Sequence, residues 1–428
     1  MLRVRDAYTD ALTGKMSSEG QRHQPFPAPS GSTLVSFPIN SKAQLPVFWT
    51  EQPNNQSVKH ALVVIHGSLR DGDSYWTALN DVKEQQIQLG NTAVDKNTII
   101  TAPMFYSTRF NSGIYTANQL SWGDLNLWQV GTPSNHPSDQ KVSSFTAVQL
   151  LIEHFDNRTM YPNLKNLTLI GHSGGAQFVS RYASVVPYTP KHTHVRYIVA
   201  DPSSSAYFTD DRPITDPNYY NLSTCGTLNE WRYGFQNFSL SPYSGKSASE
   251  YFEIYVTRDV VNLNGLMDTE LNGDQLCMAL AQGGQQRISR NLAWWKYLNR
   301  LARTDQDVSL FPGNFSNVPN WGKKLKKSQF NVKLSIVPNA THDVTEVFSS
   351  SEGVSAVYDN KNLVIGWRPT TQVTFPLINA TTSSNASSSN SSANSSFASA
   401  ADPPVHKIYA CRLALSCALL LSVLFVSL

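Results

Sequence analysis

Apolar residues in the middle of the chain form short continuous runs that alternate with longer amphipathic segments. The runs suggest buried strands of a sheet at 61–65, 98–102, 167–170, 195–200, 252–256 and 332–337, preceded by a strand pair at 33–39 and 45–50. Apolar residues recur at helical spacing in the segments 75–89, 143–156, 175–185 and 287–303. This alternation predicts an α/β protein, an open and mostly parallel sheet covered by helices.

The first strong chemical signal is Gly171-His172-Ser173-Gly174-Gly175, between the strand at 167–170 and the helix at 175–185. Ligands of open parallel sheets bind at the carboxyl ends of the strands, so this turn lies where chemistry is expected. The pattern G-x-S-x-G in a strand–turn–helix context is typical of a nucleophile elbow, which predicts Ser173 as the nucleophile. The N–H of Gly174, at the start of the helix, is then an oxyanion donor. The alternative is a glycine-rich turn with no catalytic duty.

A serine nucleophile needs a general base. The chain has ten histidines, which differ in where they lie relative to the predicted strands. In chains with such an elbow, the triad order is nucleophile, acid, histidine. Within the domain, His342 alone follows the last strand and lies downstream of Ser173, so we predict it as the base. The alternative is a histidine of a surface loop.

The acid is expected after a strand between Ser173 and His342. Asp259 lies just past the run at 252–256, and we predict that it orients His342 and stabilises the imidazolium. Asp201, after the strand at 195–200, is the competitor. A loop ion pair with Arg258 is the alternative role for Asp259.

The second oxyanion donor is expected in the loop after the strand at 61–65. His66-Gly67-Ser68 has the His-Gly signature there, and the N–H of Ser68 is the predicted donor. We expect His66 to brace this loop. Trp122 and Trp128 are predicted to form a wall of the substrate cleft.

Together these pieces resemble the α/β-hydrolase superfamily over about residues 32–352. More narrowly, the chain is similar to secreted fungal and bacterial hydrolases that are distantly similar to polyhydroxyalkanoate depolymerases. The stretches that carry this likeness are His66-Gly67-Ser68-Leu69-Arg70, Ala102-Pro103-Met104-Phe105, Ala200-Asp201-Pro202-Ser203-Ser204 and Met278-Ala279-Leu280-Ala281-Gln282-Gly283. The resemblance implies a serine-hydrolase fold and mechanism and leaves the substrate open.

The segment 202–250 is a long insertion rich in aromatic residues, and we predict a cap over the cleft. The alternative is that its aromatic side chains only pack the insertion onto the body. Cys225 in this insertion and Cys277 are the cysteines outside the C-terminal tail, and in an oxidising compartment they could form a disulfide. Two buried thiols are the alternative. No Cys/His cluster has metal-ligand spacing and no phosphate or dinucleotide fingerprint is present, so we expect neither metal nor cofactor.

The amino-acid composition excludes several further classes of protein. The 428 residues are 40% apolar and 15% charged, with a net charge of +3. The apolar content excludes a wholly disordered chain, and the near-neutral charge gives no concentrated basic face for nucleic acid. Four cysteines are too few for a disulfide-dominated scaffold.

The ends of the chain differ from the middle. We divide it into a disordered or misassigned leader (1–31), the hydrolase domain (32–352), an extension of that domain (353–378), a Ser/Asn-rich stalk (379–400) and a tail (401–428). The tail has small residues, a polar spacer and a terminal apolar run, which favours a GPI-attachment signal. A membrane-spanning tail helix is the alternative. No secretory signal is visible at the start, so the true N-terminus of the precursor lies elsewhere or the tail signal is false.

Asn-x-Ser/Thr triplets support export. They predict glycans at Asn55, Asn157, Asn221, Asn237, Asn314, Asn379, Asn385, Asn390 and Asn394. A further triplet at Asn339, three residues before His342, is expected to be unused or to point away from the cleft.

The sequence thus predicts an extracellular serine hydrolase, most simply a carboxylic-ester hydrolase with a small-molecule or polymer ester as substrate, that meets the membrane through its tail. A peptidase or an acyltransferase would use the same residues. A catalytically idle cell-surface binding protein on the same fold is the rival from another class.

Overall fold

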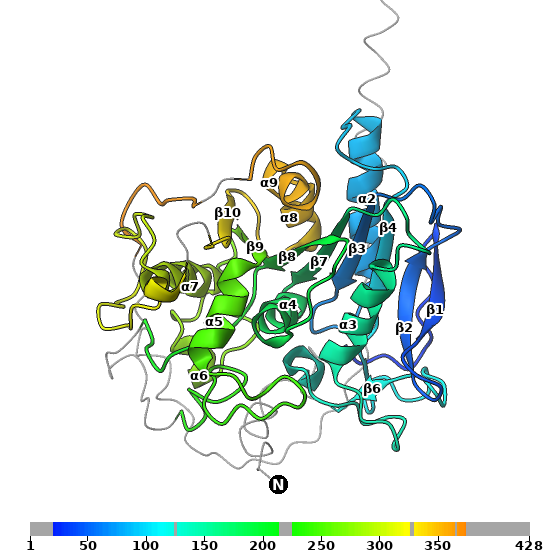
Figure 1. Cartoon of the computed structure of the whole chain (residues 1–428), viewed down its shortest axis with the longest axis horizontal. Helices are drawn as coiled ribbons and strands as arrows, with labels where there is room; N and C mark the ends of the chain where they lie inside the picture. The colour runs from blue at the N-terminus through cyan, green and yellow to red at the C-terminus, as the bar shows by residue number, and fades with distance from the viewer. Residues whose placement is uncertain (1–19, 124–125, 214–224, 326–328, 364–365, 374–428) are drawn as a thin grey trace, which may run out of the picture. The chain divides into compact units, whose positions relative to one another are not determined.

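An eight-stranded sheet runs through the described part of this computed structural model, which comprises residues 20–123, 126–213, 225–325, 329–363 and 366–373 (Figure 1). The strand order is β1-β2-β4-β3-β7-β8-β9-β10. β2 is antiparallel to β1 and β4, and the remaining neighbours are parallel. The strands are β1 (Ser32–Pro38), β2 (Gln44–Thr50), β3 (His60–Ile65), β4 (Ile99–Pro103), β7 (Asn166–His172), β8 (His194–Ala200), β9 (Asp259–Gly265) and β10 (Lys333–Val337).

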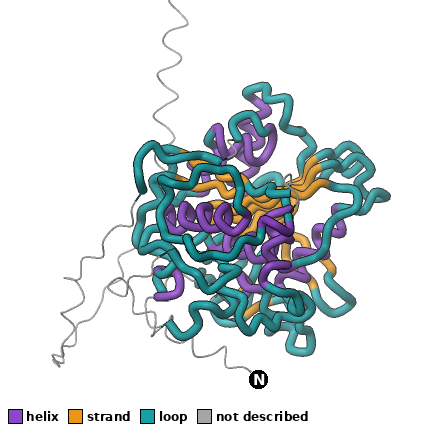
Figure 2. The backbone as a smooth tube through the Cα atoms, turned by 60° about the vertical axis from the view of Figure 1, so that its left-hand side comes forward, coloured by secondary structure: helices purple, strands orange, loops and turns teal. Residues whose placement is uncertain are grey.

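Helices cover both faces of this sheet, because successive side chains of each strand point to opposite sides. In β3, Val63 and Ile65 join one apolar cluster while Leu62 and Val64 join another. The first cluster is covered by α3 (Ser144–Phe155), α4 (Gly174–Val185), α5 (Ala248–Thr257) and α7 (Arg287–Ala302). The second is covered by α2 (Gly72–Gln88), α8 (Val344–Ser349), α9 (Ser351–Val354) and η5 (Ser355–Asp359). Figure 2 shows the strands as a layer with helices on either side.

Shorter elements line the connections. β5 (Tyr106–Ser107) pairs with β6 (Ser121–Trp122), and η2 (Leu127–Val130) leads from β6 toward α3. α6 (Cys277–Leu280) precedes α7, and η4 (Gly322–Lys324) follows it.

The predicted α/β architecture is confirmed, with one element misassigned. The run 252–256 is part of helix α5 and not a strand. Its buried residues are Tyr251, Phe252, Tyr255 and Val256, which is helical spacing, and Ser247 caps the helix in a capping box with Glu250. The strand lies just beyond it as β9, where Asn262 and Asn264 interrupt the apolar run.

The described residues belong to one unit within residues 1–377. Residues 20–31, which the sequence assigned to a leader, pack on this unit: Phe26 is 6% exposed within the second cluster, and the Arg22 N–H donates to Phe110 O at 2.9 Å. The stalk at 379–400 and the tail at 401–428 lie outside the described residues, so their boundaries remain predictions. Among the helices in the described ranges, none combines the length and apolarity that crossing a membrane requires.

Candidate active site

Ser173 occupies a strained turn between β7 and α4. Its backbone angles are φ 57° and ψ −120°, a conformation that L residues rarely adopt. The turn closes only with glycine on either side. A Cβ atom on Gly171 would lie 2.1 Å from Gly175 O, and one on Gly175 would lie 2.1 Å from Ile65 O. The local sequence therefore folds as the elbow that its glycines predict.

The elbow presents Ser173 to solvent. Its N–H donates to Ala200 O at 2.9 Å, which ties the turn to the end of β8. Ser173 is partly exposed, whereas Gly174 and the residues after it in α4 are buried. The serine hydroxyl thus stands at the helix N-terminus, where backbone N–H groups favour negative charge.

The loop after β3 lies directly against this turn. A Cβ atom on Gly174 would lie 3.1 Å from the backbone nitrogen of Ser68, and one on Gly67 would lie 3.7 Å from the Cβ of Ser173. The structure thus brings together Ser173, Gly174 and Ser68, the predicted nucleophile and the two predicted oxyanion donors.

His66 braces that loop, as expected. Its Nδ1 is 2.7 Å from Gly67 O, and its Nε2 accepts from the Phe105 N–H at 3.1 Å. Burial lowers the pKa of His66 to about 3, so the ring is neutral and can donate at one nitrogen while it accepts at the other.

His342 follows β10 and reaches the same end of the sheet. Its ring lies against that of His172, with 4.6 Å between ring centroids, and His172 directly precedes Ser173. Its Nδ1 lies 3.0 Å from Oδ2 of Asp268, a residue that follows β9. Because Nδ1–H donates to the carboxylate, Nε2 is left as the basic nitrogen.

A cation holds Asp268 in place. The Asp268 side chain is fully buried, and its Oδ1 accepts from Nη1 of Arg287 at 2.7 Å. Arg287, the first residue of α7, also donates from Nε to Ser203 Oγ at 3.1 Å and from Nη2 to Asn272. One carboxylate oxygen is therefore paired with arginine and the other with histidine.

Strand order and elbow together decide the fold class. A mostly parallel sheet with an antiparallel second strand carries a strained serine at the turn after β7. The chain has the α/β-hydrolase fold.

Comparisons with solved structures find a depolymerase and several hydrolases among the similar chains. The poly(3-hydroxybutyrate) depolymerase LpqC of Bordetella parapertussis is 18% identical, with a TM-score of 0.48 over 74% of this chain and 87% of that one. Poly(aspartic acid) hydrolase-1 of Sphingomonas sp. KT-1 is 18% identical, with a TM-score of 0.47 over 74% and 95%. The siderophore hydrolase EstB of Aspergillus nidulans is 10% identical, with a TM-score of 0.39 over 79% and 99%.

Neither the protein-family models nor the curated proteins give a match. With TM-scores below 0.5, the structural likenesses are weak. The α/β-hydrolase fold of this chain rests on its own strand order and elbow.

Asp259 does not contact His342, so the prediction that it orients this base is wrong. It begins β9 instead of following it, and the six residues to Gly265 span about 20 Å of strand. Its carboxylate is bound by His194 at 2.8 Å, Arg196 at 3.0 Å and Lys333 at 2.6 Å. Burial would raise the pKa of Asp259, but the hydrogen bond from His194 and the two cations lower it well below its usual value.

The error follows from the misassigned strand. A strand at 252–256 would place Asp259 just after its end, whereas in the structure Asp259 begins strand β9. Asp268 carried the same signal one element later, as an aspartate just after the run at 260–265. Arg287 had no sequence signal, because its partner was not known.

Asp259 lines a different cavity. This cavity of about 550 Å³ lies at the amino-terminal ends of β8 and β9 and includes His194, Tyr197 and Arg258. It is far from the elbow, at the opposite edge of the sheet.

Asp201, the competing acid, is fully buried at a positive φ of 51°. Its Oδ1 accepts from the Gly265 N–H at 2.9 Å, and its Oδ2 makes no hydrogen bond within the described residues. Burial and then the charge of Asp268 raise the pKa of Asp201 well above its usual value, which favours the neutral acid. A neutral Asp201 that secures the loop after β9 is a poor partner for an imidazolium.

The group His172, Asp201 and His342 has the spacing of metal ligands, with one donor atom from each lying within 4.8 Å of the others. His172 Nδ1 contacts the Tyr75 hydroxyl at 2.9 Å, and its Nε2 lies 3.9 Å from Asp201 Oδ2. Burial and then the charge of His342 lower the pKa of His172 well below its usual value. Because His342 is already bound to Asp268, a metal on its other nitrogen would occupy the basic position, and we derive no catalytic step from a metal here.

Trp122 and Trp128 do not form a cleft wall, which corrects the prediction for both. Each side chain is fully buried, and both rings pack on Phe105, at 5.1 and 4.8 Å between centroids. Their indole N–H groups donate to Thr132 O and Asn126 Oδ1. They support the loop of η2 from inside.

The insertion 202–250 packs on the body through its aromatic residues. Tyr207, Phe208 and Tyr243 are at most 4% exposed within the first cluster, as the alternative interpretation expects. Residues 214–224 of the insertion lie outside the described ranges, so its role as a cap over the cleft remains a prediction.

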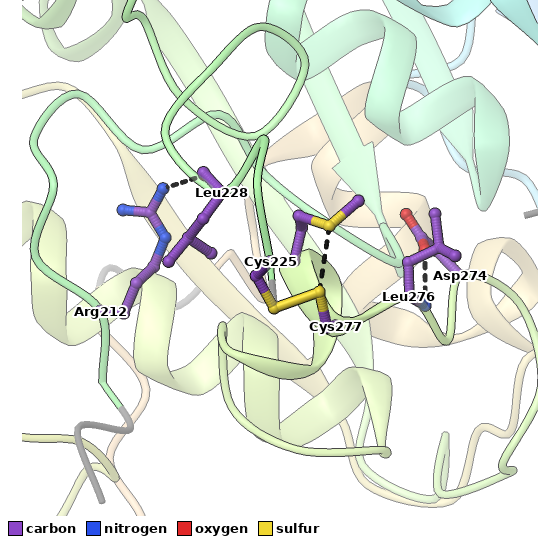
Figure 3. Close-up of a disulfide and its surroundings, with 7 residues drawn as sticks. Arg212, Cys225, Leu228, Asp274, Leu276 and Cys277 are labelled. Atoms are coloured by element: carbon purple, nitrogen blue, oxygen red, sulfur yellow. Dashed lines mark hydrogen bonds between the residues drawn. A yellow bond between two sulfur atoms is a disulfide. The ribbon is translucent and has the colours of Figure 1, made fainter. Parts of the chain in front are cut away.

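A disulfide joins Cys225 of the insertion to Cys277, the first residue of α6 (Figure 3). On either side, Arg212 donates to Leu228 O at 2.6 Å and Asp274 accepts from the Leu276 N–H at 3.2 Å. The predicted disulfide is present, and it secures the insertion to the segment that leads into Arg287.

Some of the predicted glycan sites lie within the described residues, and others lie outside them. Asn157, Asn237, Asn314 and Asn339 are exposed, and Asn55 is half-buried. Outside the described ranges lie Asn221, Asn379, Asn385, Asn390 and Asn394. Their glycosylation stays a prediction.

Proposed function

We propose that this chain is a serine hydrolase that cleaves carboxylic esters, with Ser173 as nucleophile, His342 as base and Asp268 as acid. The observation that carries the proposal is the hydrogen bond from His342 Nδ1 to the buried Asp268, beside a strained elbow serine. A turn of this kind costs free energy, and residues strained in this way cluster at active sites.

In the first half-reaction, Ser173 Oγ attacks the carbonyl carbon of the ester. His342 takes the hydroxyl proton on Nε2 and becomes an imidazolium, which the carboxylate of Asp268 stabilises through Nδ1–H. The N–H groups of Gly174 and Ser68 hold the oxyanion of the tetrahedral intermediate. The intermediate collapses when the C–O bond to the alcohol breaks and His342 returns the proton to the leaving alkoxide.

The second half-reaction repeats these steps with water. His342 removes a proton from water as the oxygen attacks the acyl carbon of the Ser173 ester. Collapse releases the carboxylic acid, and the proton returns to Ser173 Oγ. Asp268 takes no proton in either half, which suits a carboxylate already paired with Arg287 at 2.7 Å.

Amide hydrolysis and acyl transfer use the same acyl-enzyme. In amide hydrolysis the leaving group is an amine. In acyl transfer an alcohol replaces water as the acceptor of the acyl group. The geometry of Ser173, His342 and Asp268 serves all three, so they are separated by substrate panels. An idle binding protein would not need the paired histidine and acid.

We place this activity outside the cell. The Cys225–Cys277 disulfide supports this location, because such bonds persist in oxidising compartments. Exposed Asn157, Asn237 and Asn314 within sequons also support it. A mass decrease of the purified native protein on treatment with an N-glycosidase is the expected result, and an unchanged mass would count against export.

A fluorophosphonate probe and a panel of p-nitrophenyl esters test the chemistry. Wild-type protein should be labelled and should hydrolyse at least one ester, and Ser173→Ala should lose both. Ser205→Ala is a matched control, since Ser205 is a buried serine whose hydroxyl has no role in this mechanism. A folded wild-type protein that is neither labelled nor active would refute the proposal.

A further inference from the structure

Gln129 is a buried residue that carries a side-chain amide. It lies in η2, and the residue is 3% exposed. Its backbone N–H donates to Asn126 O at 3.0 Å, but within the described residues its side-chain amide makes no hydrogen bond. The amide oxygen and nitrogen both retain contact with solvent, so the amide is open to a bound substrate.

The amide is aimed at the elbow. A Cβ atom on Gly174 would lie 2.4 Å from Nε2 of Gln129, and the same atom would lie 3.1 Å from the backbone nitrogen of Ser68. Two nitrogen donors from separate loops therefore flank the residue whose own N–H is the first oxyanion donor.

The closeness of the Gln129 amide also explains why position 174 is a glycine. The neighbouring glycines, Gly171 and Gly175, are required by backbone atoms that a Cβ would strike. At Gly174 the nearest atom is the Gln129 amide itself. A side chain here would displace that amide, so the absence of one keeps the three nitrogens close together.

The backbone around Gln129 is fixed from both sides. Ser144 Oγ, at the start of α3, donates to Trp128 O at 2.6 Å. On the other side, Trp231 of the insertion donates from its indole N–H to Val130 O at 2.9 Å. The backbone on either side of Gln129 is therefore held by contacts from α3 and from the insertion, which is the support a preorganised donor needs.

We propose that the side-chain amide of Gln129 is a third oxyanion donor, which hydrogen-bonds through Nε2–H to the tetrahedral intermediate beside the N–H groups of Gly174 and Ser68. The proposal rests on the proposed function, because it needs Ser173 to form that intermediate. In the ground state the amide has no partner among the described residues, and it gains one when negative charge develops. An interaction made only at that stage lowers the barrier without tightening substrate binding.

The test compares Gln129→Met, which keeps the length and removes both donors, with Gln129→Asn, which keeps the amide but withdraws it by one methylene. Both should lower kcat by about 100-fold or more with KM within about threefold, as loss of an oxyanion donor does. The affinity for a boronic acid that mimics the tetrahedral state should fall with kcat/KM. Thermal unfolding checks that each variant is folded.

Gln119→Met is the control, because Gln119 is also buried but binds Ser36 and Thr116 away from the elbow. It should keep kcat within about threefold. If a folded Gln129→Met or Gln129→Asn keeps wild-type kcat, or raises KM alone, the proposal is wrong. If wild-type protein shows no turnover that depends on Ser173, the proposed function itself fails. If turnover depends on Ser173 but not on Gln129, only this inference fails.

Discussion

His342 Nδ1 lies 3.0 Å from Asp268 Oδ2, and these residues are 74 positions apart in the chain. The bond joins the loop after β10 to the loop after β9, which are neighbours because the two strands are parallel and paired. Replacement of the carboxylate by an amide should disturb the tautomer of His342 and remove the charge that stabilises its imidazolium. We therefore expect Asp268→Asn to lower kcat by about 10³- to 10⁴-fold, measured with an ester substrate.

Asp259→Asn is the matched comparison for that variant. It also replaces an aspartate of the β9 region by asparagine but leaves the His342 contact intact. Its kcat should stay within about threefold of wild type. A larger loss in Asp259→Asn than in Asp268→Asn would contradict the assignment.

Asp259 should make the free energy of unfolding depend on pH in the acidic range. Burial alone would raise the pKa of Asp259, but the hydrogen bond from His194 and the charges of Arg196 and Lys333 lower it below its usual value in the folded protein. A depressed pKa contributes stability above the unfolded value of about 3.9, and this contribution is lost as pH falls from there toward the folded value. The free-energy difference between wild type and Asp259→Asn should therefore shrink below about pH 4, as followed by urea unfolding.

The control is Asp305→Asn, which changes an exposed aspartate on the surface. Its difference from wild type should be small at every pH. A gap between wild type and Asp259→Asn that stays constant from neutral pH into acid would refute the linkage.

Arg287→Met should destabilise the fold. Asp268 is fully buried, and loss of Arg287 leaves its carboxylate without the cation at 2.7 Å. Removal of one partner of a buried pair costs about 3–5 kcal/mol. Chemical denaturation should show this loss, whereas Arg300→Met, at the exposed end of α7, should change stability by about 0.5 kcal/mol or less.

The double variant Arg287→Met/Asp268→Asn separates charge from packing. Removal of the buried carboxylate should recover part of the stability that Arg287→Met loses, so that the two effects are not additive. Strict additivity would show that the ion pair is not the cause.

Gly175→Ala should disrupt the elbow. The added Cβ would lie 2.1 Å from Ile65 O, a backbone atom of the central strand β3. Soluble expression and melting temperature should fall, and fluorophosphonate labelling of Ser173 should be lost. Gly226→Ala is the control, because a Cβ there meets nothing within 4 Å. Equal behaviour of the two variants would contradict the steric account.

The double variant Cys225→Ser/Cys277→Ser should be less stable than wild type, because loss of the disulfide raises the conformational entropy of the unfolded chain. The disulfide closes a loop with a sequence separation of 52, for which the chain-entropy relation gives about 4 kcal/mol. Reductant should lower the melting temperature of wild type toward that of the double variant and leave the variant unchanged. A wild-type melting temperature insensitive to reductant under unfolding conditions would argue against the bond.

The sequence by itself determined the parts of this protein that arise from neighbouring residues. Continuous apolar runs and helical spacing specify β3, β7, α4 and α7, because burial depends on local periodicity. The elbow was also local, since Gly171, Ser173 and Gly175 form one turn. The Cys225–Cys277 pair was predictable because few other cysteines competed.

Tertiary structure alone decided what depends on where separate strands end. Whether 252–256 was strand or helix could not be resolved from a short apolar run, and that choice shifted the acid from Asp268 to Asp259. Trp122 and Trp128 were recognisable as aromatic, but only packing showed that both are buried behind Phe105. Gln129 had no sequence signal, because its significance is that its side-chain amide lies beside Gly174. Such relations join residues far apart in the chain, and only the folded arrangement of loops sets the distance between them.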